Sequence, residues 1–159
     1  MSQERVIVIG GGLAGLVATC ELLEQKTPVV IIDKAQNLGG TASKATCGIA
    51  APECAAQKEA GINDSVSSLT KDTKIAEMLK DASKDVDWYV NGVGLQDLVL
   101  RRTPGHATKR TLSTTKFFAG QPLCYSCVQI LEKIAASNPD LLQIRTNAEV
   151  RTLMTTGGK

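Results

Sequence analysis

The stretch RVIVIGGGLAGLVATCELLEQKTPVVIID, from Arg5 to Asp33, decides the fold of this chain. It begins with a β-branched apolar run over residues 6–9, passes through a glycine cluster over residues 10–15, and then shows helical spacing. A second apolar run over residues 29–32 leads directly into the acid. Strand, glycine turn, helix, strand and acid in this order predict a βαβ unit that binds a dinucleotide.

Each element of this pattern has a mechanical reason. Gly10 lets the chain leave the strand in a tight turn, Gly12 lets the backbone approach a pyrophosphate, and Gly15 lets the helix pack closely on the strand. The free N–H groups at the start of the helix favour an anion. Asp33 can accept hydrogen bonds from ribose hydroxyls, and its charge disfavours a 2′-phosphorylated ligand.

Composition limits the function classes. The chain has 159 residues, about one ordinary domain, and 43% of them are hydrophobic. The net charge of +2 is too small to indicate a nucleic-acid partner. No apolar run reaches the ~18 residues that a membrane-spanning helix needs. The apolar start lacks a signal-peptide cleavage site, so we expect a soluble, intracellular protein without an N-terminal targeting segment.

The five cysteines do not indicate a disulfide framework, because their number is odd and the pattern is that of an intracellular α/β protein. Cys124-x-x-Cys127 invites a redox or zinc interpretation, but a zinc site would need a second pair. Both cysteines fall on the apolar side of a helix predicted over residues 123–137. We therefore expect small buried side chains rather than a metal or redox site.

The segment KAQNLGGTASKATCGI, residues 34–49, follows the acid and is rich in small residues. It contains a second glycine pair, Gly39-Gly40. Small side chains let a backbone lie against a large flat ligand. A flexible glycine-serine loop is the alternative, but the position directly after the acid favours a loop that contacts a flavin.

These motifs resemble those of a known family. GGGLAG and IIDKAQNLGGTASKATCGIAA are similar to the FAD-binding start of the fumarate reductase and succinate dehydrogenase flavoproteins, and most similar to the soluble fumarate reductases. The runs DSVSSLTKDT and PGHATKR resemble later family segments, so the likeness spans nearly the whole chain. Pro104 and Ala107 depart from the family pattern, which has glycine and serine there.

The resemblance implies an α/β fold, an FAD-binding Rossmann-like sheet of the glutathione-reductase type with helices packed against it, incomplete at the C-terminus. Residues 1–159 would form the FAD-binding domain. The implied activity of the longer parent is the reduction of fumarate to succinate by reduced FAD, with a small dicarboxylate as substrate. The family's proton-donating arginine would lie beyond Lys159, so no catalytic residue is assigned here and the fragment alone is expected to be inactive.

The resemblance also assigns the cofactor-binding residues. Ala14 and Gly15 would face the pyrophosphate and Asp33 the adenosine ribose. The flavin would be bordered by Thr41, Ala42, Cys47 and Gly48, and the adenine by Val150. The full set is Gly10, Gly12, Ala14, Gly15, Asp33, Lys34, Gly40, Thr41, Ala42, Cys47, Gly48 and Val150. Members that bind flavin covalently use a histidine near the position of Thr41 or Ala42, and none occurs here, so FAD should be non-covalent.

The middle of the chain gives weaker signals. Residues 50–73 predict a loop with one short helix, and residues 74–90 show helical spacing that ends before Gly92. Residues 101–116 are locally basic. This stretch fits either an anion site or a solvated polar loop, whereas a nucleic-acid patch would need interleaved aromatic residues. It holds the only histidine, His106, which is not nominated as catalytic.

At the C-terminal end, a helix over residues 123–137 is followed by two predicted strands, residues 141–145 and 149–155. Residues 155–159 carry a hairpin-turn signal.

Three rival functions remain open. Another oxidoreductase of the same family, such as an L-aspartate oxidase or a ketosteroid dehydrogenase, would share all these motifs. A nicotinamide-binding module is disfavoured by Gly39-Gly40. A truncated product that binds nothing firmly is the third.

Overall fold

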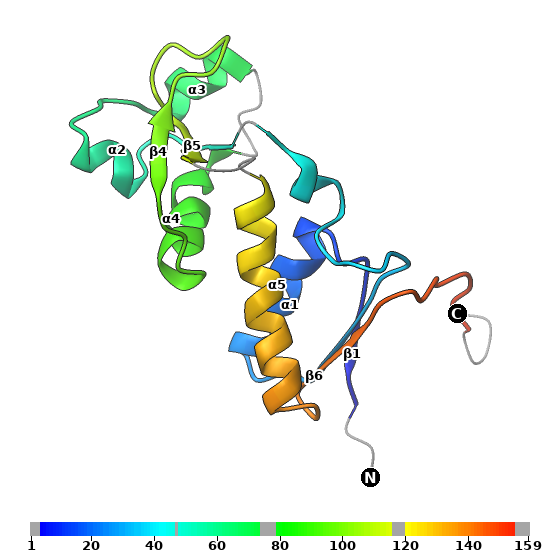
Figure 1. Cartoon of the computed structure of the whole chain (residues 1–159). Coiled ribbons are helices and arrows are strands. Elements are labelled where there is room, and N and C mark those ends of the chain that lie inside the picture. The colour runs from blue at the N-terminus through cyan, green and yellow to red at the C-terminus, as the bar shows by residue number, and fades with distance from the viewer. Residues whose placement is uncertain (1–3, 47, 74–78, 116–119, 155–159) are drawn as a thin grey trace. The chain divides into compact units, whose positions relative to one another are not determined.

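The chain divides into two units, each with its own three-stranded sheet. The computed structural model describes residues 4–46, 48–73, 79–115 and 120–154. The first unit comprises Met1–Ala42 and Cys127–Lys159, and the second comprises Ser43–Ser126. Figure 1 shows the elements in chain order.

The sheet of the first unit is parallel, in the order β1-β2-β6. Strand β1 (Val6–Ile9) pairs with β2 (Val29–Ile32), which pairs on its other side with β6 (Leu142–Arg145). Strand β2, the second strand of the βαβ start, lies at the centre of this sheet in the described part of the chain. The more completely buried strand is the central one, since Val29 and Ile31 have no exposed surface.

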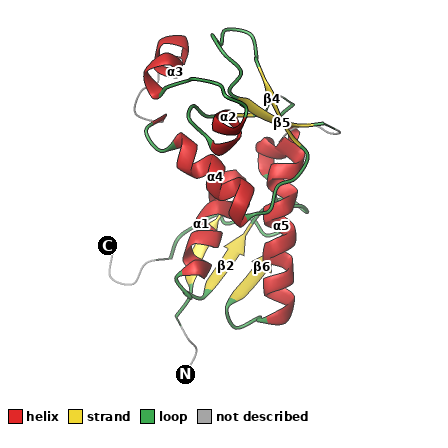
Figure 2. Ribbon diagram, turned by 90° about the vertical axis from the view of Figure 1, so that its left-hand side faces the viewer, coloured by secondary structure: helices red, strands yellow, loops and turns green. Residues whose placement is uncertain are grey.

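Two helices cover the same face of this sheet, as Figures 1 and 2 show: α1 (Leu13–Glu24) and the part of α5 (Gly120–Ser137) that belongs to the first unit. Val8 points toward α1, where its side chain lies near Gly15. Its neighbours in β1 point to the opposite face because side chains alternate along a strand. Those neighbours, Ile7 and Ile9, are 61% and 54% exposed.

The sheet of the second unit is antiparallel, in the order β3-β5-β4. Its strands are β3 (Ile49–Ala50), β4 (Leu98–Arg101) and β5 (Thr111–Thr114). The helices of this unit are α2 (Ala55–Glu59), α3 (Val66–Thr73) and α4 (Ala82–Gly92). Its core is built around Ala51, Cys54, Val86 and Leu112.

Much of the predicted secondary structure is confirmed, including β1, α1, β2, α5 and β6. Two interpretations of the middle of the chain are wrong. Residues 50–73 hold two helices, α2 and α3, instead of one. Of the helix expected over residues 74–90, residues 79–81 are not α-helical, and α4 begins at Ala82. Residues 74–78 lie outside the described residues.

The strand expected over residues 149–155 is also wrong for its described part. Residues 149–154 form no strand, and none of the described strands pairs with them. Leu153 and Met154 are 74% and 97% exposed, so they lack the burial that their apolar character indicated. The hairpin turn expected over residues 155–159 lies outside the described residues.

Within the described ranges, every helix is too short or too polar to cross a membrane.

Candidate cofactor-binding site

The glycine turn after β1 has the backbone conformation that the motif requires. Gly10 has φ +99°, a region that favours glycine, and its N–H donates to the carbonyl of Ile32 over 2.8 Å. A Cβ at Gly15 would overlap the carbonyl oxygen of Gly10, so only glycine lets α1 start this close to β1. The turn therefore closes onto β2 and places the start of α1 beside it.

Gly12 differs from Gly15 in what surrounds it. A Cβ at Gly12 would meet no atom within 4 Å, and its φ of −74° is accessible to any residue. The fold itself therefore does not need glycine here. The open space beside this backbone, at the N-terminus of α1, is where an anion would be stabilised by the helix dipole and the free N–H groups. Ala14 lies exposed in this first turn.

Asp33 is fixed by two backbone donors. Its Oδ2 accepts the N–H of Gly11 over 2.6 Å, and its Oδ1 accepts the N–H of Ala35 over 2.7 Å. These bonds hold the carboxylate at the glycine turn, where a ribose next to a pyrophosphate would lie. The next residue, Lys34, is exposed.

Sequence reasoning missed Gly11. Its N–H holds Asp33, and a Cβ there would overlap the side chain of Leu38, which is only 7% exposed. The signal was present in the sequence, because a third consecutive glycine exceeds what the dinucleotide motif needs.

The second glycine pair packs against the first. Gly39 donates its N–H to the carbonyl of Gly11 over 2.7 Å and forms an isolated bridge with Gly12. Gly40 has φ +55°, and a Cβ there would lie 3.0 Å from the Cα of Gly12. Glycine at these positions therefore lets the second glycine pair pack directly on the backbone of the first.

The residues assigned to the flavin are distributed over both units. Thr41 and Ala42 belong to the first unit and lie in the 3-10 helix η1 (Gly40–Lys44). Gly48 belongs to the second unit, has φ +135°, and lies against the carbonyl of Leu112, so that a Cβ would overlap it. Cys47 lies outside the described residues.

The segment assigned to the adenine runs beside the acid. Asn147 donates its N–H to the carbonyl of Ala35 over 3.0 Å, and Ala148 donates to the carbonyl of Asp33 over 2.9 Å. Val150 follows on this segment and is 38% exposed. The structure thus brings Val150 to the same end of the sheet as Asp33, although the strand predicted around it is absent.

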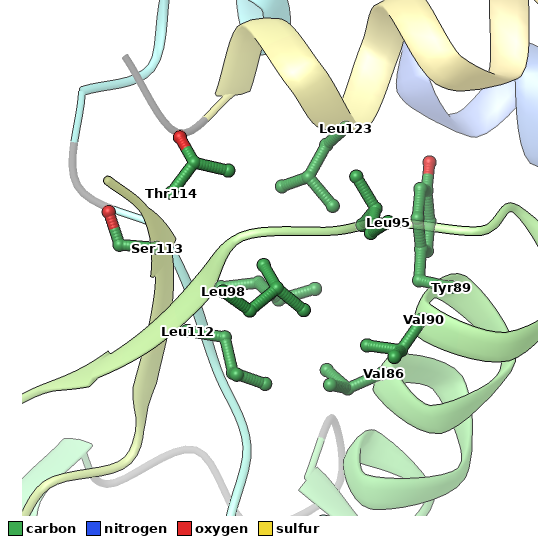
Figure 3. Close-up of a pocket in the computed structure, with 10 residues that line it drawn as sticks. Val86, Tyr89, Val90, Leu95, Leu98, Leu112, Ser113, Thr114 and Leu123 are labelled. Atoms are coloured by element: carbon green, nitrogen blue, oxygen red, sulfur yellow. The ribbon is translucent and has the colours of Figure 1, made fainter. Parts of the chain in front are cut away.

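A small apolar cavity in the second unit is not a ligand site. Figure 3 shows it in the second unit, between α4, β4 and β5, with side chains including Val86, Leu98 and Leu112 around it. Its volume of about 10 Å³ is at the lower limit for a single water molecule, and its lining is apolar. It is a packing void in the core.

The cysteines of the CxxC motif are buried, as predicted. Cys124 and Cys127 are 1% and 0% exposed. The thiol of Cys127 hydrogen-bonds that of Cys20 on α1, which together with burial raises the pKa of Cys20 far above its usual range. A neutral thiol in such surroundings behaves as a small apolar side chain.

The basic stretch after β4 is only partly a solvated loop. Arg101, Arg102 and Lys109 are exposed. Arg110, by contrast, is fully buried and directly precedes β5, which begins at Thr111. The interpretation as a solvated loop is therefore wrong from Arg110 onward, because long-range ion pairs hold this residue in the interior. His106 is half-buried, with Nδ1 3.2 Å from the hydroxyl oxygen of Thr103.

Comparison with known proteins decides the family. The family model described as "FAD binding domain" matches residues 5–159, which is nearly the whole chain and extends across both units. The chain belongs to the FAD binding domain family. The glycine turn and Asp33 are thus part of an FAD-binding fold.

Individual relatives refine the likeness. Fumarate reductase of Schizosaccharomyces pombe is 38% identical over 97% of this chain, and fumarate reductase 1 of Saccharomyces cerevisiae is 31% identical over 94%. The chain spans only 32% and 35% of those two proteins, about a third of their length. The open conformation of a flavocytochrome c3 fumarate reductase superposes with a TM-score of 0.81 at 21% identity, covering 97% of this chain and 28% of that one, which confirms the predicted fold.

Proposed function

We propose that this chain is the cofactor-binding part of a flavin-dependent fumarate reductase and that it holds FAD without a covalent bond. The observation that supports FAD most strongly is the bond from the Gly11 N–H to Asp33, because it places an acceptor for ribose hydroxyls at the glycine turn. The residues present fit the cofactor: Gly12 leaves room for a pyrophosphate, and the Gly39-Gly40 turn adds no side-chain bulk.

The proposed roles of the residues combine this arrangement with the family resemblance. Gly12 and Ala14, at the N-terminus of α1, would offer backbone N–H groups to the pyrophosphate, and Asp33 would accept from the ribose. Thr41, Ala42 and Gly48 would border the isoalloxazine ring, and Val150 the adenine. Bound FAD would supply the hydride chemistry, while the chain supplies binding and orientation.

Fumarate is the proposed substrate of the full-length protein because both relatives described above are fumarate reductases aligned along nearly the whole chain. The test is an assay of the full-length protein, after its flavin content has been measured. Fumarate, L-aspartate and a 3-ketosteroid are offered in parallel. Turnover of fumarate supports the proposal, whereas selective turnover of either other substrate assigns a different oxidoreductase of the same family. A protein without flavin contradicts the whole proposal.

The non-covalent attachment rests on the absence of a histidine near Thr41 and Ala42, since the only histidine of the sequence is His106. That residue lies in the second unit, next to Thr103. After acid precipitation of the holoprotein, the flavin should remain in the supernatant. Flavin retained in the precipitate would contradict non-covalent binding.

A further inference from the structure

The second unit contains a buried charge cluster formed by Arg110, Asp64 and Asp72. Arg110 Nη2 lies 2.9 Å from Asp64 Oδ1 and donates to the Ser68 hydroxyl over 3.0 Å, while Nη1 lies 2.9 Å from Asp72 Oδ2. The side chains of Arg110 and Asp64 are fully buried, and that of Asp72 is 16% exposed. The guanidinium thus bridges α3 and the loop before it.

Buried charges of this kind constrain geometry strongly. Arg110 and Asp64 have lost their water, so each is stable only while its partner stays within reach. The guanidinium faces two acids at once: Nη2 donates a hydrogen bond to Asp64, whereas Nη1 forms an ion pair with Asp72. Asp72 Oδ2 also accepts the N–H of Ala107 over 2.8 Å, and Gln57 donates to both Asp64 and the carbonyl of Lys109. The start of β5 is therefore held from several directions.

The backbone of Arg110 carries this constraint to the segment assigned to the flavin. Its carbonyl accepts the N–H of Ala51 over 3.1 Å, and β3 pairs with β5 immediately beyond. Gly48, the residue before β3, lies against the carbonyl of Leu112 with no room for a Cβ. Gly48 thus packs against β5, and the side chain of Arg110 anchors the residue that directly precedes β5.

We propose that Arg110, with Asp64 and Asp72, is a positioning site that holds Gly48 against the isoalloxazine ring without touching the cofactor. This inference rests on the proposed function, since it takes Gly48 as a flavin neighbour. It assigns the cluster a specific effect: its loss should disturb the flavin end of FAD and leave the binding of the adenosine end unchanged.

The experiment compares FAD with ADP, which occupies only the nucleotide half of the site, in the full-length protein. The first variant is Arg110→Lys, which keeps the positive charge but removes the planar guanidinium and its several donors. The second is Asp72→Asn, which weakens one ion pair. The matched control is Arg102→Met, an exposed arginine of the same basic stretch. Affinities are measured by titration, and the environment of the flavin is measured by visible circular dichroism.

For both variants we expect the Kd for FAD to rise about tenfold, the Kd for ADP to stay within about twofold, and the visible dichroism of bound flavin to change. The control should match the wild type. Unchanged FAD affinity and dichroism would overturn the positioning role, and so would an equal loss of FAD and ADP binding, which marks a general folding defect. If Arg110→Lys does not fold, Asp72→Asn decides alone. Failure of the wild type to bind FAD would instead overturn the proposed function.

Discussion

Gly11 donates its backbone N–H to Oδ2 of Asp33 over 2.6 Å, so the acid that follows β2 is fastened to the turn that follows β1. Two segments separated by the whole of α1 are thereby joined at one end of the sheet. Gly11 also packs against Leu38 with no space for a side chain, which explains why a third glycine stands between Gly10 and Gly12.

Replacement of Asp33 tests the ribose contact. Asp33→Ala should weaken FAD binding by ~1–3 kcal/mol, because it removes a hydrogen-bonding partner from the ribose and from two backbone N–H groups. Isothermal titration of the full-length protein measures the loss. Glu59→Ala, an exposed acid at the end of α2, is the control and should leave the affinity unchanged. Equal affinities for all three proteins would show that Asp33 does not contact the cofactor.

Gly12 and Gly15 should respond differently to substitution. Gly12→Val should fold normally, since a Cβ there meets nothing, yet lose FAD binding because the side chain fills the space for the pyrophosphate. Gly15→Ala should destabilise the protein itself, because its methyl group would overlap the carbonyl of Gly10. Thermal unfolding combined with flavin content separates the two effects. Full flavin occupancy in Gly12→Val would mean that the open space is not the pyrophosphate site.

Substitution of Leu112 should destabilise the core of the second unit. This side chain is 2% exposed and borders the small apolar void, so Leu112→Ala should lower the free energy of unfolding by about 2–5 kcal/mol through lost contacts and an enlarged cavity. Leu153→Ala is the matched control: that leucine is 74% exposed, and its change should stay within ~0.5 kcal/mol. Urea denaturation reports both. Similar values for the two variants would contradict the described core.

The cysteine thiols should be unreactive, and their raised pKa values should make the folded protein less stable as the pH rises. The pKa of Cys20 is raised by its hydrogen bond to Cys127 and by burial, and burial raises the pKa of Cys54. A raised pKa in the folded state gives stability that is fully present below about pH 9, the ordinary pKa of a thiol, and is lost as pH rises from there toward the folded value. Unfolding free energy should therefore fall between pH 9 and pH 10.

The same thiols should resist iodoacetamide at pH 8 in the native state and react in urea, because the thiolate is the nucleophile. Mass spectrometry of digested protein measures the labelling of each site. Native labelling of Cys20 as fast as in urea would refute the assignment.

The 159-residue chain alone, supplied with FAD, should not reduce fumarate. The chain spans about a third of the fumarate reductases that it matches, and we expect the proton-donating arginine implied by the family resemblance to lie outside that third. Loss of such a group removes much of the transition-state stabilisation. The assay is fumarate-dependent oxidation of a reduced viologen dye. Turnover on the order of 10 per second, ordinary for an enzyme, would contradict this expectation and place the proton donor within the chain.

The βαβ start could be predicted from the sequence because its information is local. The apolar runs of β1 and β2, the glycine turn and Asp33 lie close together along the chain, and each residue type has its own backbone or side-chain reason to be there. The helical spacing that marks α5 and the apolar run that marks β6 are equally local signals.

Only the tertiary structure decided which part of the basic stretch is buried and whether the last apolar run forms a strand. The local sequence indicates a solvated cation at Arg110. Its burial is possible because Asp64 and Asp72, far away in sequence, form ion pairs that offset its loss of water. Residues 149–154 had strand-like composition but found no partner strand, and a strand is stable only when its backbone groups are paired. Pairing and burial depend on which distant segments meet, and no local pattern of side chains carries that information.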